Sequence, residues 1–283
     1  MSLKSVVGAS GGLRGLLFPL FARLNPGDVT IRHHYTGDAL RLHSFRHRGY
    51  WWHGRDREAD TMEAFRGLIR PGFTVFDVGT HIGYISLYFA YLVGRAGRVH
   101  SFEPGENNLP YTRRNLAGHA NITVVEKALG AEPGRATLYL EDLSGQNNSL
   151  VQSYKGLALS SGSAVRAHVR EVSVEVSTLD TYVASTGAVP DFVKIDVEGF
   201  ELGVLQGADD VLRNRRPMWM VETAGESADA VLALFRSHGY TAYRPDGTVV
   251  TRRDELVVNT CFLHPERHAD AIRGLGWPVV PPS

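Results

Sequence analysis

The sequence predicts a doubly wound α/β fold: a mostly parallel sheet with an antiparallel edge and helices on both faces. From residue 73 onward, short apolar runs typical of buried parallel strands alternate with longer segments that carry apolar residues at helical spacing. The first apolar run ends in a glycine-containing turn, Asp77-Val-Gly-Thr-His-Ile-Gly83, that leads into a helical segment. Strand–helix alternation with such a turn is typical of folds that bind ligands at the carboxyl ends of their strands.

The expected elements follow one another at regular spacing. Core strands are expected at residues 74–78, 98–103, 122–125, 191–196 and 218–222, and helices at 82–93, 107–116, 201–214 and 228–238. Residues 241–244 and 255–263 are expected to form the antiparallel edge. Residues 135–140 and 170–176 alternate with period 2, which predicts two more strands flanking a polar insertion at 144–163 near the ligand.

These elements divide the chain into an N-terminal extension at 1–70, one α/β domain at 71–265 with its insertion around 141–170, and a C-terminal tail at 266–283. The apolar segment at 11–24 has an uncharged stretch of only 15–22, far shorter than the roughly 20 apolar residues that span a bilayer. It is expected either to form an amphipathic helix that packs on the domain or to contact a membrane surface or a partner.

Composition narrows the class of protein. The chain is 43% hydrophobic and 21% charged, and its 30 acidic residues balance its 30 basic ones, as in an ordinary soluble protein. A balanced charge gives no support for binding to nucleic acid. The single cysteine, Cys261, excludes an internal disulfide, so we expect a reducing, cytoplasmic location and a buried strand thiol. The oligomeric state stays open, a homodimer included.

The glycine turn has the features of a nucleotide-binding turn. Gly79 and Gly83 lack Cβ, which allows a ligand to approach the backbone, and the next helix offers free N–H groups. Asp77 can meet an ammonium group, and Glu103, about 20 residues on, can accept hydrogen bonds from two ribose hydroxyls. The spacing G-x-x-x-G lacks the third glycine of G-x-G-x-x-G, which argues against a nicotinamide cofactor without excluding it.

Several motifs in a fixed order carry a family resemblance. They are Val75-Phe-Asp-Val-Gly-Thr-His-Ile-Gly-Tyr84, Ser101-Phe-Glu-Pro104, Lys127-Ala-Leu-Gly130, Asn148-Ser-Leu150, Ser177-Thr-Leu-Asp180 and Val193-Lys-Ile-Asp-Val-Glu-Gly199. Over residues 72–222 the chain resembles the FkbM family of methyltransferases. The resemblance implies a class I methyltransferase (Rossmann-like) fold, S-adenosylmethionine as cofactor and, most often, O-methylation of a small molecule, sugar or lipid-linked glycan.

The resemblance also implies a cofactor site made of the glycine turn and the motifs that follow it. Its expected members are Asp77, Gly79, His81, Ile82, Gly83, Glu103, Lys127, Ala128 and Asp196. One departure stands out, because the family commonly has Ala-Asn where this chain has Thr80-His81. His81 is therefore expected beside the methionine part of the cofactor, where it contacts cofactor or substrate or simply hydrogen-bonds within the turn.

Carboxylates at the strand ends are the candidates for the chemistry. A hydroxyl acceptor loses its proton as its oxygen attacks, so a base is needed nearby. We expect Asp196, at the end of the fourth core strand, to be that base or to orient the substrate, and Glu198 is the second candidate. Lys194 lies on the same strand face as Asp196 and is a catalytic candidate or an ion-pair partner. Glu222, at the end of the fifth strand, should lie beside them.

Each carboxylate also has a simpler interpretation. Asp196 could contact only the cofactor, and Glu198 could cap the next helix. Together with Glu222 they could bind a divalent cation through oxygen ligands. No ligand spacing here is diagnostic of a metal site, so none is predicted.

Residues expected to contact the acceptor come from three parts of the chain. The segment at 41–57, RLHSFRHRGYWWHGRDR, is either a lid whose Tyr50 and Trp52 bind the acceptor or a strand pair whose aromatic residues pack on the sheet. Asn148 and Ser149 of the polar insertion, and Glu222, complete the set.

The sequence thus predicts an O-methyltransferase acting on a small molecule, natural product or glycan. A carboxylate or amine methyltransferase, a nicotinamide-dependent oxidoreductase and a cofactor-binding module without catalysis are the alternatives, and the acceptor itself is not identified.

Overall fold

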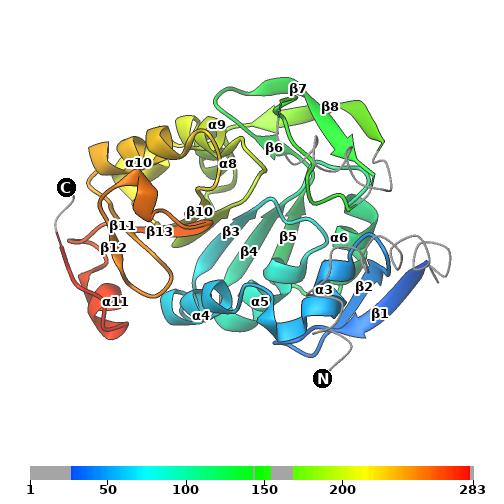
Figure 1. The fold of residues 1–283 in the computed structure, drawn as a ribbon, viewed down its shortest axis with the longest axis horizontal. Helices are drawn as coiled ribbons and strands as arrows, with labels where there is room; N and C mark the ends of the chain where they lie inside the picture. Colours follow the sequence, from blue (N-terminus) through cyan, green and yellow to red (C-terminus); the bar gives the residue numbers. More distant parts are fainter. Residues whose placement is uncertain (1–26, 143, 154–167, 281–283) are drawn as a thin grey trace.

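The centre of the fold is an eight-stranded sheet with the strand order β12-β11-β13-β10-β9-β3-β4-β5 (Figure 1). The computed structural model describes residues 27–142, 144–153 and 168–280. In sheet order the strands are β12 (Val249–Val250), β11 (Thr241–Tyr243), β13 (Asn259–Leu263), β10 (Met218–Glu222), β9 (Phe192–Ile195), β3 (Thr74–Val78), β4 (Arg98–Phe102) and β5 (Ile122–Val125). The strands from β10 to β5 are parallel, and β13 is antiparallel to β10 and β11. The predicted sheet with an antiparallel edge is therefore confirmed.

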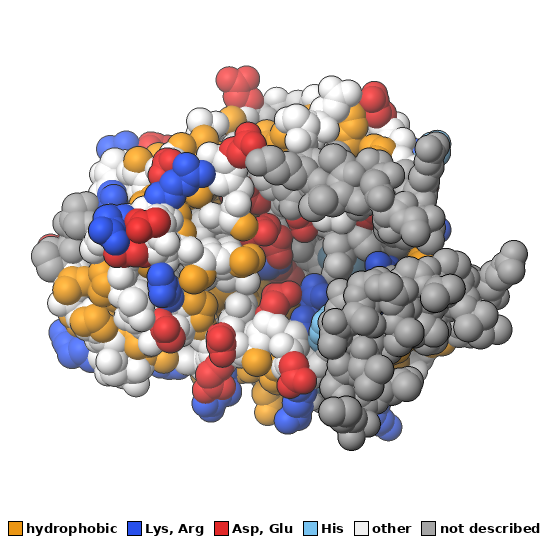
Figure 2. Space-filling view, in the orientation of Figure 1, with side chains coloured by type: hydrophobic (Ala, Val, Ile, Leu, Met, Phe, Trp, Pro, Cys, Tyr) orange, Lys and Arg blue, Asp and Glu red, His pale blue; other side chains and the backbone are white. Residues whose placement is uncertain are grey.

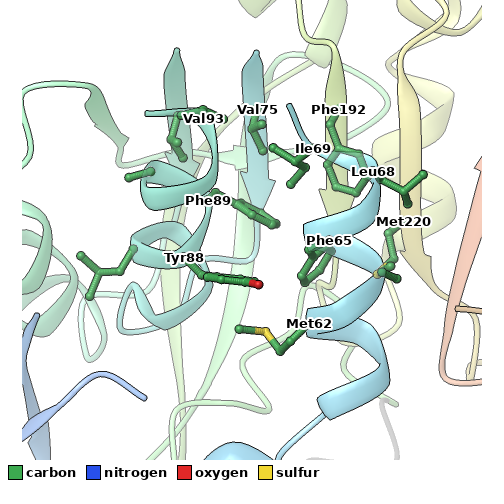
Figure 3. Close-up of a cluster of buried hydrophobic side chains, with 14 of the residues drawn as sticks. Met62, Phe65, Leu68, Ile69, Val75, Tyr88, Phe89, Val93, Phe192 and Met220 are labelled. Atoms are coloured by element: carbon green, nitrogen blue, oxygen red, sulfur yellow. The ribbon is translucent and has the colours of Figure 1, made fainter. Parts of the chain in front are cut away.

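Helices cover both faces of this sheet, as a doubly wound fold requires (Figure 1). One face carries α4 (Ala59–Leu68), α5 (Tyr84–Val93) and α6 (Leu109–Leu116), and the other carries α8 (Leu179–Thr186), α9 (Glu201–Gln206), the π-helical turn η2 (Val211–Arg215) and α10 (Ala228–Ser237). Side chains of β3 alternate between the two cores, with Val75 in the first and Phe76 in the second. Figure 3 shows the first core, where Phe65 of α4 and Phe89 of α5 meet edge to face.

The predicted core strands are confirmed to within one residue at each end. The predicted helix at 201–214 is wrong as a single element, because α9 ends before Gly207 and η2 follows separately. Asp180 causes the break. Its carboxylate accepts hydrogen bonds from the N–H groups of Asp210 (2.9 Å) and Val211 (3.1 Å), and its own N–H donates to the carbonyl of Gly207 (3.0 Å). These bonds begin a new turn where the old one would have continued.

A smaller sheet of order β6-β8-β7 lies beside the main one (Figure 1). Its strands are β6 (Ala128–Leu129), β7 (Gly134–Glu141) and β8 (Val169–Ser177). β7 and β8 are the two strands predicted from their period-2 alternation, and they pair antiparallel along the whole length of β7. Helix α8 was not predicted, although Thr178 at its N-cap accepts a hydrogen bond from the N–H of Thr181 (3.0 Å), a recognisable start signal.

The described part of the N-terminal extension is a hairpin followed by short helices. Its elements are β1 (Asp28–Arg32), β2 (Ala39–His43), α3 (Arg48–His53) and the 3₁₀ turn η1 (Gly54–Asp56); near the C-terminus lie η3 (Arg253–Glu255) and α11 (Ala269–Gly274). The strand-pair interpretation of segment 41–57 is therefore wrong beyond His43. Tyr50 is buried in α3, whereas its neighbour Trp51 is 39% exposed, so the aromatic residues do not pack on the sheet as a group.

Three sequence expectations fall on segments outside the described residues: the apolar segment 11–24, the part of the polar insertion at 154–163 and the end of the tail at 281–283. Within the described ranges, no helix has the length and apolar character that crossing a membrane requires. Cys261 is fully buried in β13, as predicted, and burial raises the pKa of its thiol.

Candidate active site

A cavity opens at the carboxyl ends of β3, β4 and β9, where a doubly wound topology places ligands. The empty space there is about 570 Å³, counting the part open to solvent. Of the predicted site residues, Gly79, His81, Glu103, Lys127, Ala128, Asn148, Asp196 and Glu198 line it. Asp77, Ile82, Gly83, Lys194, Ser149, Tyr50, Trp52 and Glu222 are not in its wall. Acidic side chains gather in the hollow near the middle of the face in Figure 2.

The glycine turn brings the backbones of β3 and β9 together. Gly79 has a φ of +87°, and a Cβ there would overlap the carbonyl oxygen of Asp196. Only glycine allows both this conformation and this contact. Gly83, with a φ of +88°, instead lies against the side chain of Leu116 on α6, and Ile82 is fully buried in the core. The first glycine therefore shapes the cavity, whereas the second glycine and Ile82 support the turn from behind.

Glu103 follows β4 and holds the wall opposite the turn. Its Oε2 accepts a hydrogen bond from the N–H of His81 (2.8 Å), and its Oε1 accepts from the N–H of Gly105 (2.8 Å) and from the Asn108 side chain (3.3 Å). Burial raises the pKa of Glu103 to about 7, despite these three donors. Glu103 therefore changes charge close to neutral pH.

His81 connects three separate parts of the chain. Its Nδ1 lies 2.9 Å from the Tyr50 hydroxyl of α3, and its Nε2 lies 3.2 Å from the carbonyl oxygen of Ser144 in the polar insertion. A carbonyl only accepts, so Nε2 carries the proton and Tyr50 donates to Nδ1. Burial lowers the pKa of His81 to about 3, which keeps the ring neutral. The residue that departs from the family pattern thus ties the extension and the insertion to the glycine turn.

Lys194 is a buried cation between two carboxylates. Its Nζ lies 3.6 Å from Asp77 and 3.2 Å from Asp196, and it donates to the carbonyl of Gly79 (3.3 Å). Burial alone would lower the pKa of Lys194, but Asp196 and Asp77 raise it above its usual value. Asp77 is fully buried and also accepts from the Ser86 hydroxyl (2.5 Å). Asp77 thus belongs to the ion pair beneath the cavity and is not in the cavity wall.

The three predicted carboxylates come together above Lys194. Asp196, Glu198 and Glu222 each offer an oxygen within 4.8 Å of the others. Burial raises the pKa of Glu222 to about 10, and the charges of Asp196 and Glu198 add to this rise. Burial would also raise the pKa of Asp196, but the charge of Lys194 and a hydrogen bond from Glu222 have the larger combined effect. The pKa of Asp196 is therefore lowered. At neutral pH the pair is therefore an ionised Asp196 and a protonated Glu222.

The remaining predicted residues lie in the outer wall or away from the cavity. Asn148 accepts from the N–H of Glu141 (2.9 Å) at the end of β7, and the Ser149 hydroxyl donates to the carbonyl of Glu198 (2.7 Å). Lys127 lines the cavity and pairs with Glu175 of β8. Trp52 packs edge to face on Trp51 at the surface of α3 and does not reach the site.

Sequence reasoning missed several lining residues, among them Asn108 and Phe200. Phe200 directly follows the recognised motif Val193–Gly199, and Asn108 comes four residues after the motif Ser101–Pro104. The Oδ1 of Asn108 is buried and has no hydrogen-bond partner among the residues that the structure describes. Their closeness in sequence to those motifs was the one signal that could have identified them as site residues.

A family model and one relative identify the family, and further proteins are similar to this chain. A model described as "Methyltransferase FkbM domain" matches residues 77–242. A 31-O-demethyl-FK506 methyltransferase from Streptomyces tacrolimicus is 30% identical over 258 residues, which cover 83% of this chain and 92% of that protein. Methyltransferase 1 of Beauveria bassiana is 29% identical over 61% of this chain and 74% of its own. A crystal structure of methyltransferase FkbM from Methylobacillus flagellatus aligns with a TM-score of 0.44 and 17% identity, over 71% of this chain and 50% of that one.

Proposed function

Because this chain belongs to the FkbM family of S-adenosylmethionine-dependent methyltransferases, we propose that it methylates a hydroxyl group of a small molecule, natural product or glycan. The observation that carries the proposal is the ionised carboxylate of Asp196, which borders the cavity at the end of β9. The family excludes the nicotinamide-dependent alternative. The name of the Streptomyces relative gives an O-demethyl compound as its substrate, which supports oxygen as the acceptor atom.

The cavity has groups suited to S-adenosylmethionine. Glu103 would accept the ribose hydroxyls, and the Gly79 turn, which lines the cavity, would lie beside the methionine part. The unpartnered, buried Oδ1 of Asn108 would accept a hydrogen bond from a ligand N–H group. Ala128 offers an apolar wall. When bound, this cofactor supplies a methyl group on a positively charged sulfur.

The site contains a group that can accept the proton of the acceptor hydroxyl. An acceptor oxygen that took the methyl group would displace the neutral thioether as the methyl–sulfur bond broke, and Asp196 would take the proton from the acceptor's O–H bond. The Asp196 side chain is 35% exposed, so an acceptor in the cavity can reach it, whereas Lys194 beneath it is only 8% exposed. Lys194 fixes the orientation of the carboxylate, and protonated Glu222 adds a hydrogen bond to it.

The product distinguishes hydroxyl from carboxylate acceptors. We expect the purified protein to transfer a labelled methyl group from S-adenosylmethionine to polyhydroxylated natural products or glycans. A methyl ether survives mild alkali, whereas a methyl ester releases methanol. Base-labile label would contradict hydroxyl transfer, and so would label on nitrogen found by mass spectrometry.

Binding of S-adenosylhomocysteine is expected to tighten about tenfold between about pH 6 and pH 8, because Glu103 ionises over this range. Below its pKa of about 7 the carboxyl is neutral; above it, the carboxylate makes stronger, charge-assisted bonds to ribose hydroxyls. Calorimetric titration across this range measures the effect. Glu103→Gln should remove the slope, and Glu126→Gln, at an exposed glutamate paired with Arg113, should keep it. A slope that persists in Glu103→Gln would assign it to another group.

Methyl transfer is expected to be independent of divalent cations, although three carboxylates meet in the site. Lys194 already neutralises Asp196, and Glu222 holds a proton, so the cluster carries less negative charge than a hard cation prefers. Rates after dialysis against EDTA, with and without added Mg²⁺ or Mn²⁺, provide the measurement. A loss of about tenfold or more that Mg²⁺ restores would instead identify the cluster as a metal site.

A further inference from the structure

Arg57 of the N-terminal extension lies close to the glycine turn, although it is not in the cavity wall. Its guanidinium stands over the Tyr50 ring at 4.7 Å, and Tyr50 in turn bonds to His81 of the turn (2.9 Å). Gly49 makes room for it, because a Cβ there would lie 2.7 Å from Arg57 Nη1. Arg57 precedes residues 77–242, so the family comparison gives it no role.

The charge of Arg57 acts on the glycine turn and also on Asp196 at the end of β9. It contributes to lowering the pKa of His81 in the glycine turn and that of Asp196 at the end of β9. Its own surroundings are Tyr50, Tyr84 at the start of α5, and the carboxylates of Glu58 and Asp196. The guanidinium is thus near enough to the turn, to Tyr84 and to Asp196 for its charge to act on each of them.

Backbone strain is concentrated at the same place. Four non-glycine residues of the described chain have left-handed φ. Two of them, His81 (+54°) and Glu198 (+57°), line the cavity, and a third, Glu58 (+52°), is the residue after Arg57. Such conformations are unfavourable for these residue types and tend to occur at functional sites. Glu58 directly follows Arg57 and sets its direction where α4 begins.

Arg57 has hydrogen-bond donors to spare. Its side chain is 25% exposed, and the described residues give it one carboxylate, Glu58 Oε1 at 3.3 Å from Nη2. A guanidinium has five N–H donors in a planar fork that matches a carboxylate. Lys194 is already held between Asp77 and Asp196, and Lys127, which lines the cavity, pairs with Glu175. The methionine part of the cofactor brings a carboxylate to this turn, and Arg57 is the cation placed to receive it.

We propose that Arg57 binds the methionine carboxylate of the cofactor, so that the N-terminal extension completes the cofactor site. This inference rests on the proposed function, because it takes S-adenosylmethionine to be the ligand. It gives the extension a part in binding the cofactor, in addition to any contact with the acceptor.

Two nucleosides that differ in the amino acid part provide the test. S-adenosylhomocysteine carries the carboxylate, and 5′-methylthioadenosine has the same adenosine and sulfur without it. Arg57→Gln is expected to weaken S-adenosylhomocysteine binding by about 10- to 100-fold, the range for losing a hydrogen-bonded charge, and to leave 5′-methylthioadenosine unchanged. Arg57→Lys should retain part of the affinity. Calorimetric titration measures both ligands.

Arg55→Gln is the matched control. Arg55 lies two residues away, also stands over a tyrosine ring (Tyr35, 5.6 Å) and donates to the carbonyl of His34 (2.9 Å), away from the cavity. It should bind both nucleosides like the unaltered protein.

Failure of the role of Arg57 and failure of the proposed function would give different results. Unchanged affinity in Arg57→Gln, or an equal loss for both nucleosides in Arg57→Gln and Arg57→Lys, would overturn the role of Arg57. If the unaltered protein bound neither nucleoside, the proposed function would fail first, and this inference with it.

Discussion

Replacing Asp196 with asparagine should reduce kcat for a hydroxyl acceptor by about 10²- to 10⁴-fold, the usual contribution of a positioned base. Asparagine keeps the shape of the side chain and can still accept a hydrogen bond from Lys194, which lies 3.2 Å away in the native protein. It cannot take the proton that the acceptor loses. Cofactor affinity should change little, so single-turnover rates with the cofactor saturating are the measurement.

The pH profile makes this first prediction more specific. The pKa of Asp196 is below its usual value, so the native carboxylate stays ionised across neutral pH and its activity should not fall between about pH 8 and pH 6 on its account. The Asn variant should instead gain rate with rising pH, as the acceptor hydroxyl itself ionises. A kcat within about threefold of the native value would show that Asp196 is not the base, as expected for a carboxylate acceptor.

Replacing Lys194 with methionine is expected to lower the free energy of unfolding by about 3–5 kcal/mol, the usual cost of removing one partner of a buried ion pair. Two carboxylates, Asp77 and Asp196, would then share a region where Lys194 is only 8% exposed and Asp77 is fully buried. Urea unfolding at pH 7 measures the loss. Lys127→Met is the control, since Lys127 pairs with Glu175 at the surface and should cost about 1 kcal/mol or less.

The loss in Lys194→Met should shrink as the pH falls. The lowered pKa of Asp196 means that its ion pair contributes stability above the unfolded pKa near 4 and loses it as the pH falls through the folded value. In the variant the carboxylates bind protons at higher pH, which relieves their repulsion. A deficit that is equally large at about pH 5 and pH 8 would mean that lost packing, not uncompensated charge, causes it.

The sheet and its strand ends could be predicted from sequence because the signals are local. Apolar runs such as 74–78 and 218–222 are buried on both faces, and their lengths mark the strands. Parallel neighbours end at the same edge, so Asp196 and Glu222 had to meet once β9 and β10 were adjacent. The break after α9 could not be predicted, because it depends on Asp180, more than 20 residues earlier in the chain.

The parts of the site that come from the extension were harder to predict. Tyr50 was chosen for its aromatic ring, but the structure gives it a contact with His81, which depends on how α3 folds over the glycine turn. Arg57 ends the segment 41–57 that was singled out, but nothing in the sequence distinguished it from the other arginines there, and Glu58 gave no signal. Trp52, chosen for the same reason as Tyr50, packs against Trp51 and has no such contact with the glycine turn. Residue type alone does not separate such neighbours on one short helix.

The buried thiol in the antiparallel edge allows the rate at which this part of the fold opens to be measured. Cys261 sits in β13 between Met220 of β10 and Tyr243 of β11, and no other cysteine occurs in the chain. A thiol reagent therefore modifies the protein only when these three strands separate, and the reaction rate counts those separations. Ligands that bind the folded state slow this reaction in proportion to their affinity, so inhibitors and candidate acceptors can be ranked without knowledge of the product.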